Sequence, residues 1–336
     1  MPSACGLRYK KTDKQGTRST MSETSWSLVG DIGATNARFA LVDPGGAIIK
    51  PRALPCDNYP TIADAIAEYL GDAGGAPPQR ALFAIAAPAS GDVVRMTNHP
   101  WSFSISELRD ALKMRSVRIV NDFHAAAAAI PHLKDDDRVQ VGPGEPVAGG
   151  PVGVLGPGSG LGVSSLITTS QGPLAIPGEG GHVTMAPADA REGQVLDIMR
   201  ERFDHVSAER LLSGPGLVNI YNVLCELSHV PAAGLTAPQI TDPKSAEDYP
   251  CAKETTDMFC AMFGTIAGNL ALTLGARGGI YIAGGIIPKL GDRFANSSFR
   301  ERFEAKGRFS SYLSQIPTYV VIQPYAALLG ASKLLD

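Results

Sequence analysis

Cysteine is scarce in this chain, and its few residues are scattered. The five are Cys5, Cys56, Cys225, Cys251 and Cys260, an odd number without a Cys-x-x-Cys pair in 336 residues. This pattern is unlike a disulfide framework or a zinc site, so we expect reduced thiols. A cytoplasmic location agrees with that state.

A strong excess of charge and a long apolar run are also missing. The net charge is −3, which gives no reason to expect nucleic acid or an anionic membrane as a partner. No apolar run reaches the length needed to span a bilayer. Residues 1–24 are basic and lack the apolar core of a secretory signal. We expect a disordered tail there, or an upstream start before a true initiator at Met21; a transit peptide is the alternative.

Glycine, by contrast, is abundant, with 37 residues. Near the N-terminus, residues 28–42 have the sequence LVGDIGATNARFALV, two apolar stretches joined by a turn that carries Asp31, Gly33 and Thr35. The common phosphate loops place phosphate at a helix N-terminus, whereas this segment predicts strand, turn and strand. We therefore expect a hairpin whose turn holds a nucleotide phosphate.

The same pattern recurs at residues 154–167, VLGPGSGLGVSSLI, where Gly33 aligns with Gly158 and Leu41 with Leu166. Backbone N–H groups can converge on an anion only where no Cβ blocks the approach, which explains the glycines. Either segment alone is compatible with an ordinary glycine-rich β-turn. Two of them, each opening half of the chain, predict two related lobes that clamp one phosphorylated ligand.

Length and apolar spacing agree with two α/β lobes. A chain of 336 residues exceeds the usual size of one core. Apolar spacing predicts helices over 62–70, 106–114 and 262–274. Apolar runs predict buried strands over 81–87, 117–120 and 279–287.

Asn121 and Asp122 follow the strand predicted over 117–120. In open α/β sheets the ligand crevice lies outside the carboxyl ends of the strands, so this pair stands where chemistry is expected. A carboxylate that accepts a hydroxyl proton is a recurrent part of phosphoryl transfer to an alcohol, and Asp122 is our candidate for that base. The alternative is that Asn121 and Asp122 only cap the alanine-rich helix that follows.

A third polar cluster lies in the glycine-rich stretch 178–182, which contains Glu179 and His182. A carboxylate and an imidazole on such a loop can bond to the hydroxyls of a cyclic polyol. A solvent-exposed turn or, less well supported by spacing, a metal site are the alternatives. Further on, Glu209 begins a capped helix and, taken alone, is a solvated carboxylate. Gly284 and Gly285 end a buried strand, where a flat base or ribose can lie on bare backbone.

These motifs together resemble the bacterial-type glucokinase family, the zinc-free branch of the hexokinase/actin-like ATPase superfamily. The resemblance covers nearly everything from Leu28 to the C-terminus, with six motifs in the family's order. They are Asp31-x-Gly33-x-Thr35-Asn36, Asn121-Asp122, Gly156-x-Gly158-Ser159-Gly160-Leu161-Gly162, Gly178-Glu179-Gly180-Gly181-His182, Ser207-Ala208-Glu209 and Ala283-Gly284-Gly285.

The resemblance implies a two-lobed actin-like ATPase (ribonuclease H-like) α/β fold with a cleft. The small lobe would comprise 25–131 and 321–336, and the large lobe 132–320. It implies transfer of the γ-phosphoryl group of ATP to the 6-hydroxyl of glucose, with Mg²⁺, and a homodimer.

The resemblance also assigns roles to residues. Asp122 is the implied catalytic base. The implied glucose ligands are Asn121, Asp122, Glu179, His182 and Glu209. The implied ATP-binding residues are Gly30, Asp31, Ile32, Gly33, Ala34, Thr35, Asn36, Gly158, Ser159, Gly160, Gly284 and Gly285, with Asp31 also holding Mg²⁺ indirectly.

Two positions depart from the family pattern, Ala34 where a second glycine is usual and Pro157 where a small residue is common. Alanine is compatible with the turn if its φ stays negative, so we expect slight stiffening and retained activity. Within the enzyme class, a broader hexokinase, a fructokinase or a mannokinase remains open. A non-catalytic sugar-sensing regulator is a distant alternative, because too few residues precede the first strand for a helix-turn-helix module.

Overall fold

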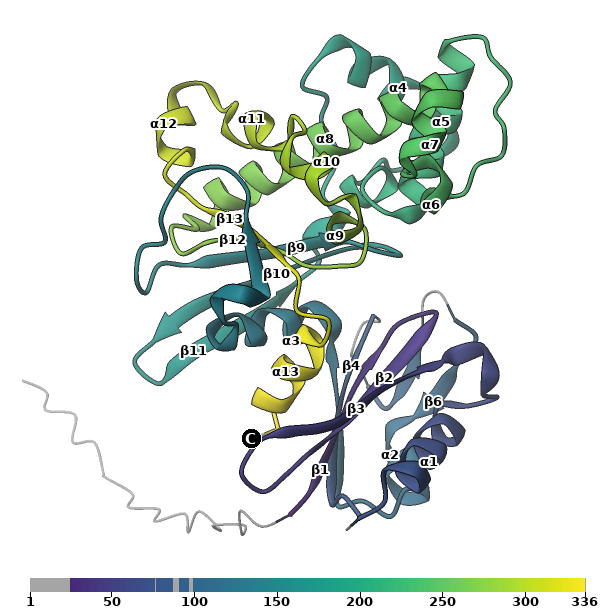
Figure 1. Ribbon diagram of the computed structural model, residues 1–336, viewed down its shortest axis with the longest axis vertical. Helices are drawn as coiled ribbons and strands as arrows, with labels where there is room; N and C mark the ends of the chain where they lie inside the picture. The colour runs from purple at the N-terminus through teal and green to yellow at the C-terminus, as the bar shows by residue number, and fades with distance from the viewer. Residues whose placement is uncertain (1–24, 76, 87–90, 97–98, 336) are drawn as a thin grey trace, which may run out of the picture.

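The computed structural model describes residues 25–75, 77–86, 91–96 and 99–335. The tail predicted over 1–24 lies outside the described residues, as does Ala87 at the end of one predicted strand. Two large sheets carry the fold, and helices lie between them and on their outer faces (Figure 1).

The first sheet has the strand order β3-β2-β1-β4-β7. Its strands β1 and β2 form the predicted N-terminal hairpin, and β1, β4 and β7 run parallel to one another. The bounds are β1 (Ser27–Ile32), β2 (Asn36–Val42), β3 (Ile48–Pro55), β4 (Arg80–Ile85) and β7 (Ser116–Asn121).

The second sheet repeats this arrangement in the order β11-β10-β9-β12-β13, with β8 added at the edge. Again three strands form an antiparallel meander, and β9, β12 and β13 run parallel. The bounds are β8 (Arg138–Gln140), β9 (Val152–Pro157), β10 (Leu161–Thr169), β11 (Gly172–Gly178), β12 (Gly279–Ile282) and β13 (Thr318–Val321). The duplication inferred from the two glycine-rich turns is therefore present in the sheets that carry them.

The two hairpins match up to the turn and differ after it. Ile32 lies opposite Ala37 in the first hairpin, whereas Pro157 lies opposite Leu161 in the second. The second turn is thus one residue shorter. Gly33 still corresponds to Gly158, but Leu41 corresponds to Ser165, so the alignment of Leu41 with Leu166 is wrong by one residue.

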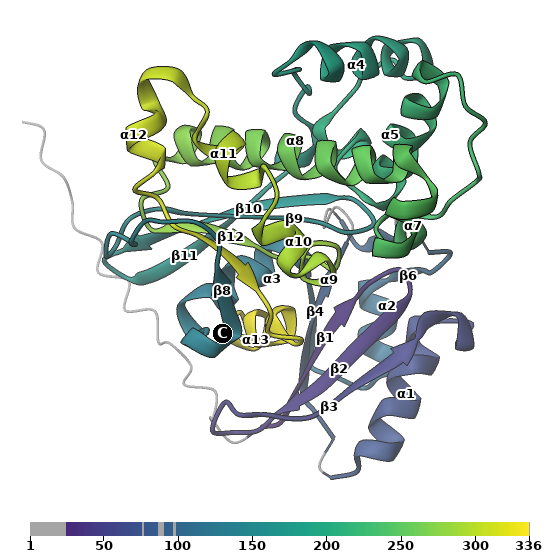
Figure 2. The same cartoon turned by 45° about the horizontal axis from the view of Figure 1, so that its top comes forward.

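Helices α3 (Asp122–Ala129) and α13 (Ala326–Lys333) lie side by side between the two sheets (Figures 1 and 2). The alanines from Ala125 to Ala129 are all buried, some against the first sheet and some against the second. A Cβ added at Gly330 would lie 1.7 Å from the carbonyl oxygen of Ala125. Small residues therefore allow α3 to pack against two sheets and a helix at once.

The outer face of the second sheet is covered by a large helical layer around α8 (Pro250–Leu274), visible at the top of Figure 2. The helix predicted over 262–274 is only its second half. Among the described helices, α8 alone is long and apolar enough to cross a membrane. The expectation that no apolar run is long enough to span a bilayer is therefore wrong for α8. However, 67% of its apolar window is buried inside the protein, as in a core helix.

The outer face of the first sheet is covered by α1 (Ile62–Ala73) and α2 (Ile105–Ala111), which confirm two predicted helices.

The remaining strands are β5 (Val93–Arg95) and β6 (Ser102–Ser104). The remaining α-helices are α4 (Ala190–Arg202), α5 (Gly214–Leu227), α6 (Ala237–Ile240), α7 (Pro243–Asp248), α9 (Ile287–Leu290), α10 (Asp292–Ala295), α11 (Phe299–Glu304) and α12 (Ser310–Leu313). Single 3₁₀ turns span Cys56–Asn58, Ile130–His132, Asp135–Asp137, Gly180–His182, Ala208–Arg210 and Gly307–Phe309. The division into a small lobe of 25–131 with 321–336 and a large lobe of 132–320 stays a prediction.

Candidate active site

Asp31 and Asp122 meet at the carboxyl edge of the first sheet because the strands that carry them are parallel. Ile32, Ile85 and Asn121 are in register across β1, β4 and β7. Asp31 therefore comes just before this row and Asp122 just after it, at the edge where ligands bind in open α/β sheets. The two carboxyl groups are close enough for the charge of Asp31 to raise the pKa of Asp122.

The surroundings of Asp122 raise the pKa of its carboxyl from 3.8 to about 6. Burial makes the largest contribution, followed by the negative charge of Asp31, and Glu179 adds a smaller one. The N–H of Phe123 donates to Asp122 Oδ1 at 2.9 Å and partly opposes the shift. A general base works best when its pKa lies near the operating pH, so this environment suits base catalysis.

Asn121 is also a helix cap, as the alternative interpretation of this pair predicted. Its Oδ1 accepts hydrogen bonds from the N–H groups of Phe123, at 2.9 Å, and His124, at 3.2 Å. None of the described hydrogen bonds uses its side-chain nitrogen. Asn121 therefore begins α3 with its oxygen and still offers an amide donor.

Glu179 and His182 lie on the turn that follows β11. His182 Nε2 is 3.9 Å from Glu179 Oε2, and His182 Nδ1 is 4.0 Å from Glu209 Oε1. The side chains of Glu179 and His182 are 70% and 59% exposed, so they face a solvent-accessible space. In the described part of the chain no group of three or more His, Cys, Asp or Glu residues is placed to hold a metal ion.

The surroundings of Glu209 differ from those predicted from the sequence. It lies on the 3₁₀ turn Ala208–Arg210, capped by Ser207, and the helix α5 begins only at Gly214. Its Oε2 accepts a hydrogen bond from the Leu161 N–H at 2.8 Å, and its side chain is 33% exposed. Glu209 is therefore anchored to the second hairpin, which the interpretation as a solvated helix carboxylate did not foresee.

The tips of the two hairpins keep a few backbone N–H groups free of internal bonds. The Gly33 N–H donates to Asn36 O at 3.0 Å, and the Gly158 N–H donates to Gly160 O at 2.8 Å. Among the described hydrogen bonds, none uses the N–H groups of Ala34, Thr35, Ser159 or Gly160. These four groups, and not those of Gly33 and Gly158, are available to an anion.

Ala34 is compatible with its turn. Among the described non-glycine residues, a positive φ occurs at Lys50, Lys113 and His229, so Ala34 keeps a negative φ. An alanine adopts that conformation without strain. The condition set for Ala34 from the sequence is met.

Two other residues predicted to bind ATP, Gly30 and Ile32, lie in the interior and not at a hairpin tip. Gly30 and Ile32 are inside the first sheet, where a Cβ at Gly30 would lie 2.6 Å from Phe83 Cδ1 and the Ile32 side chain is fully buried. Arg38 was not among the candidates, yet its Nη1 donates to Asp31 Oδ2 at 2.9 Å. The sequence held a signal for this pair, because Asp31 and Arg38 lie directly opposite each other in the predicted hairpin.

Gly284 and Gly285 follow β12 and lie beside the turn end of the second hairpin. Gly284 has φ +85°, and a Cβ there would lie 2.6 Å from the Pro157 carbonyl oxygen. A Cβ at Gly285 would meet open space. The loop therefore packs closely on the hairpin at one glycine and presents bare backbone at the next.

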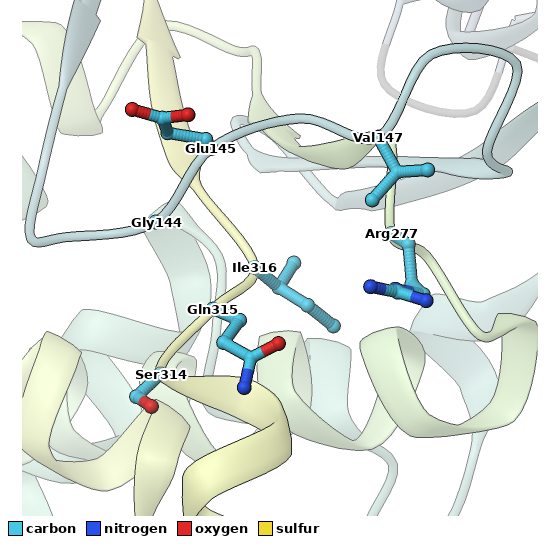
Figure 3. Close-up of a pocket in the computed structure, with 7 residues that line it drawn as sticks. All are labelled: Gly144, Glu145, Val147, Arg277, Ser314, Gln315 and Ile316. Atoms are coloured by element: carbon cyan, nitrogen blue, oxygen red, sulfur yellow. The ribbon is translucent and has the colours of Figure 1, made fainter.

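A hollow of about 410 Å³ lies at the opposite end of the second sheet. Side chains of Arg277, Gln315 and Ile316 extend into it (Figure 3). Arg277 precedes β12 and Ile316 precedes β13, so this hollow lies at the amino ends of the parallel strands. The acidic cluster at the carboxyl ends is the better candidate for chemistry.

Comparisons with known proteins agree with one another. A family model described as Glucokinase matches residues 28–336. A glucokinase of Aromatoleum aromaticum is 49% identical over 94% of this chain and 96% of its own length. The crystal structure of a glucokinase from an Antarctic psychrotroph is 34% identical with a TM-score of 0.80, covering 93% of this chain and 98% of that one. A ROK family glucokinase from Streptomyces griseus, solved in complex with glucose and AMPPNP, shares the fold at 20% identity and a TM-score of 0.62, covering 92% of this chain and 99% of that one.

Proposed function

Because this chain belongs to the glucokinase family, we propose that Asp122 is the general base that takes the proton from the 6-hydroxyl of glucose. The activity is that of the family, transfer of the γ-phosphoryl group of ATP to glucose to give glucose 6-phosphate and ADP. The duplicated sheets form the two-lobed fold of the actin-like ATPases. The observation that carries the assignment of the base is the burial of Asp122 beside Asp31, with its pKa raised to about 6.

Glucose would bind between the edges of the two sheets. Asn121 and Asp122 would contact it from the first sheet, and Glu179, His182 and Glu209 from the second. Carboxylates accept and the Asn121 amide donates, which matches a ring of sugar hydroxyls. The S. griseus neighbour, solved with glucose and the ATP analogue AMPPNP, supports the presence of both ligands in this fold.

ATP would place its phosphates between the tips of the two hairpins. The N–H groups of Ala34, Thr35, Ser159 and Gly160 would donate to phosphate oxygens, in the manner of other backbone anion sites. The adenosine would lie near Gly285, where the backbone is open. Because water near the phosphates would compete with the sugar, closure of the two lobes would favour transfer to glucose.

The described residues form no cluster that could hold a metal ion by itself, but the charge at this edge suits a magnesium ion that is held indirectly. Asp31 is mostly buried, and its pKa is raised by burial against the opposing effect of Arg38. Asp31 and Glu179 both raise the pKa of Asp122, which marks a local excess of negative charge that a divalent cation would offset. Asp31 would hold Mg²⁺ indirectly, and the ion would neutralise charge on the transferred phosphoryl group when bound.

A coupled assay for sugar 6-phosphate tests this function. With ATP and Mg²⁺, we expect product from glucose and compare it with mannose, fructose and N-acetylglucosamine. Product from fructose without product from glucose would overturn the substrate assignment. Omitting Mg²⁺ in the presence of a chelator tests the metal separately.

A homodimer and a cytoplasmic location remain proposals. The dimer rests on the family resemblance, and the location rests on the scattered cysteines, which are expected to be reduced. Light scattering behind a sizing column gives the mass in solution. A mass near that of the 35.2 kDa chain would contradict the dimer. Fractionation of the native cells tests the location.

A further inference from the structure

The sugar-binding turn is fastened to the second phosphate hairpin by the side chain of Glu209. Its Oε2 accepts from the Leu161 N–H at 2.8 Å across 48 positions of sequence. A Cβ added at Gly160 would lie 2.5 Å from the same oxygen. The carboxylate therefore packs directly against the hairpin tip.

A second link joins the same two segments. The Gly214 N–H donates to the Gly158 carbonyl oxygen at 2.8 Å. Ser213, which is buried, donates from Oγ to the Glu209 carbonyl oxygen at 2.8 Å and accepts from the Gly216 N–H at 3.0 Å. The turn that carries Glu209 is thus fixed to the N-terminus of α5, and the hairpin is fixed to both.

The two oxygens of Glu209 have different surroundings. Oε2 is engaged by the hairpin, whereas Oε1 faces His182, with Nδ1 at 4.0 Å. Glu179 has no described contact with the hairpin tip and pairs only with His182, at 3.9 Å. Of the two glutamates assigned to glucose, Glu209 alone bridges to the backbone expected to hold phosphate.

We propose that Glu209 is a positioning residue for ATP as well as a ligand for glucose. Through Oε2 it orients the Leu161 N–H and the neighbouring N–H groups of Ser159 and Gly160, while Oε1 is left for a sugar hydroxyl. This inference rests on the proposed function for both halves, the glucose ligand and the phosphate site at the hairpin tip. One carboxylate then couples the two substrate sites, so sugar and nucleotide bind with mutual dependence.

The strength of the link follows from its chemistry. A hydrogen bond from an N–H to a carboxylate is shorter and stronger than a neutral one. Without it, the hairpin keeps the link from Gly214 to Gly158, but residues 159–161 must be ordered by the nucleotide, and that ordering lowers affinity. We expect a loss of about tenfold in nucleotide affinity, the factor that corresponds to about 1.4 kcal/mol.

The experiment measures ADP binding by calorimetry in the absence of sugar. Glu209→Ala should weaken ADP binding about tenfold. Glu209→Gln, whose amide oxygen still accepts from Leu161, should stay within about threefold of the parent. Glu179→Ala is the matched control, because it removes a sugar carboxylate that does not contact the hairpin tip; its ADP affinity should equal that of the parent.

Amide exchange at Leu161 gives a readout that is independent of activity. Exchange should be faster in Glu209→Ala than in the parent and in Glu179→Ala. Unchanged ADP affinity in Glu209→Ala, or an equal loss in Glu179→Ala, would overturn the coupling. Failure of the parent to phosphorylate glucose would overturn the proposed function and leave the ADP measurements interpretable.

Discussion

At the scale of single residues, Asp122 is under opposing demands. Burial and the charge of Asp31 favour its neutral form, whereas a general base must be ionised to accept a proton. The pKa of about 6 reconciles them, since the group is ionised at neutral pH and still basic enough to assist.

The pH profile should therefore show this group. The carboxyl pKa of the ligand-free protein is raised to about 6, so kcat/KM for glucose should fall as the pH is lowered through about 6, with the slope of one proton. A coupled assay in constant ionic strength buffers measures it. Asp31→Asn removes one of the charges that raise this pKa. The fall in the remaining activity on the acid side of the profile should then occur at lower pH. An acid limb near 4 in the parent would contradict the assignment.

The same perturbation predicts an effect on stability. A carboxyl whose folded pKa is raised stabilises the fold fully only below its unfolded pKa, and this contribution is lost as the pH rises through about 6. Ligand-free Asp122→Asn should then be more stable than the parent at pH 8, by up to about 3 kcal/mol. The difference should vanish near pH 3.5. Urea unfolding at both pH values measures it, and a variant destabilised at pH 8 would argue against the raised pKa.

Much of the residue-level site was predictable, and the remainder depended on distant contacts. The sequence identified Asn121 and Asp122 because they end a strand, and the structure brings Asp122 close to Asp31. It could not show that Glu209 contacts Leu161, because nothing local fixes a bond across 48 positions. The pairing of Asp31 with Arg38 was available from the hairpin and was overlooked.

At the scale of elements, the packing of α3 against α13 holds Asp122, the proposed base, in place. Asp122 is the first residue of α3, and α13 packs against the alanines that follow. The close approach at Gly330 allows this, because a Cβ there would lie 1.7 Å from the Ala125 carbonyl oxygen. A side chain at residue 330 would overlap the backbone of α3, and backbone atoms cannot move aside by a small rotation as a side chain can.

Gly330→Ala should destabilise the protein by about 2–4 kcal/mol, within the range for overpacking of a tight core. Gly193 in α4 is the matched control, because a Cβ there meets nothing within 4 Å. Gly193→Ala should raise stability by up to about 1 kcal/mol through helix propensity. Urea unfolding of both variants measures the contrast. Equal effects of the two substitutions would mean that the packing of α3 against α13 tolerates a methyl group.

Elements with a local signal were predicted, and those without one were not. Both glycine-rich hairpins and α1 carry clear apolar patterns or caps, including the Thr61 capping box. The first half of α8 was missed, because its buried residues Cys251, Ala252, Thr255 and Thr256 have helical spacing but are small or polar, so they give a weak apolar pattern. The second turn was taken as equal in length to the first, since a pattern of glycines does not fix the register beyond a turn.

At the scale of the whole molecule, the proposed sugar ligands are divided between the two sheets. Asn121 and Asp122 follow the first, whereas Glu179 and Glu209 are attached to the second. Glu179 and His182 remain largely exposed, so their hydrogen-bonding groups face solvent. A ligand that contacts both sets gains more from an arrangement that brings them together, and such differential contact is what shifts a conformational equilibrium.

We therefore expect D-glucose to draw the two sheets toward each other. Small-angle scattering should show a smaller radius of gyration at saturating D-glucose, and amide exchange should slow at Phe123 and around His182. L-glucose is the control, because it has the same composition and hydroxyl count with the opposite handedness, so it cannot satisfy the same set of donors and acceptors.

At a hundredfold excess over its dissociation constant, D-glucose should also stabilise the fold by about 2.7 kcal/mol, which a thermal shift would register. Stabilisation without any change in the radius of gyration or in amide exchange would mean that the sugar binds to a preformed site. An equal response to L-glucose would mean that the response does not depend on specific recognition of D-glucose. Slower exchange at His182 alone would place the sugar on the second sheet only, and would separate glucose binding from the approach of Asp122.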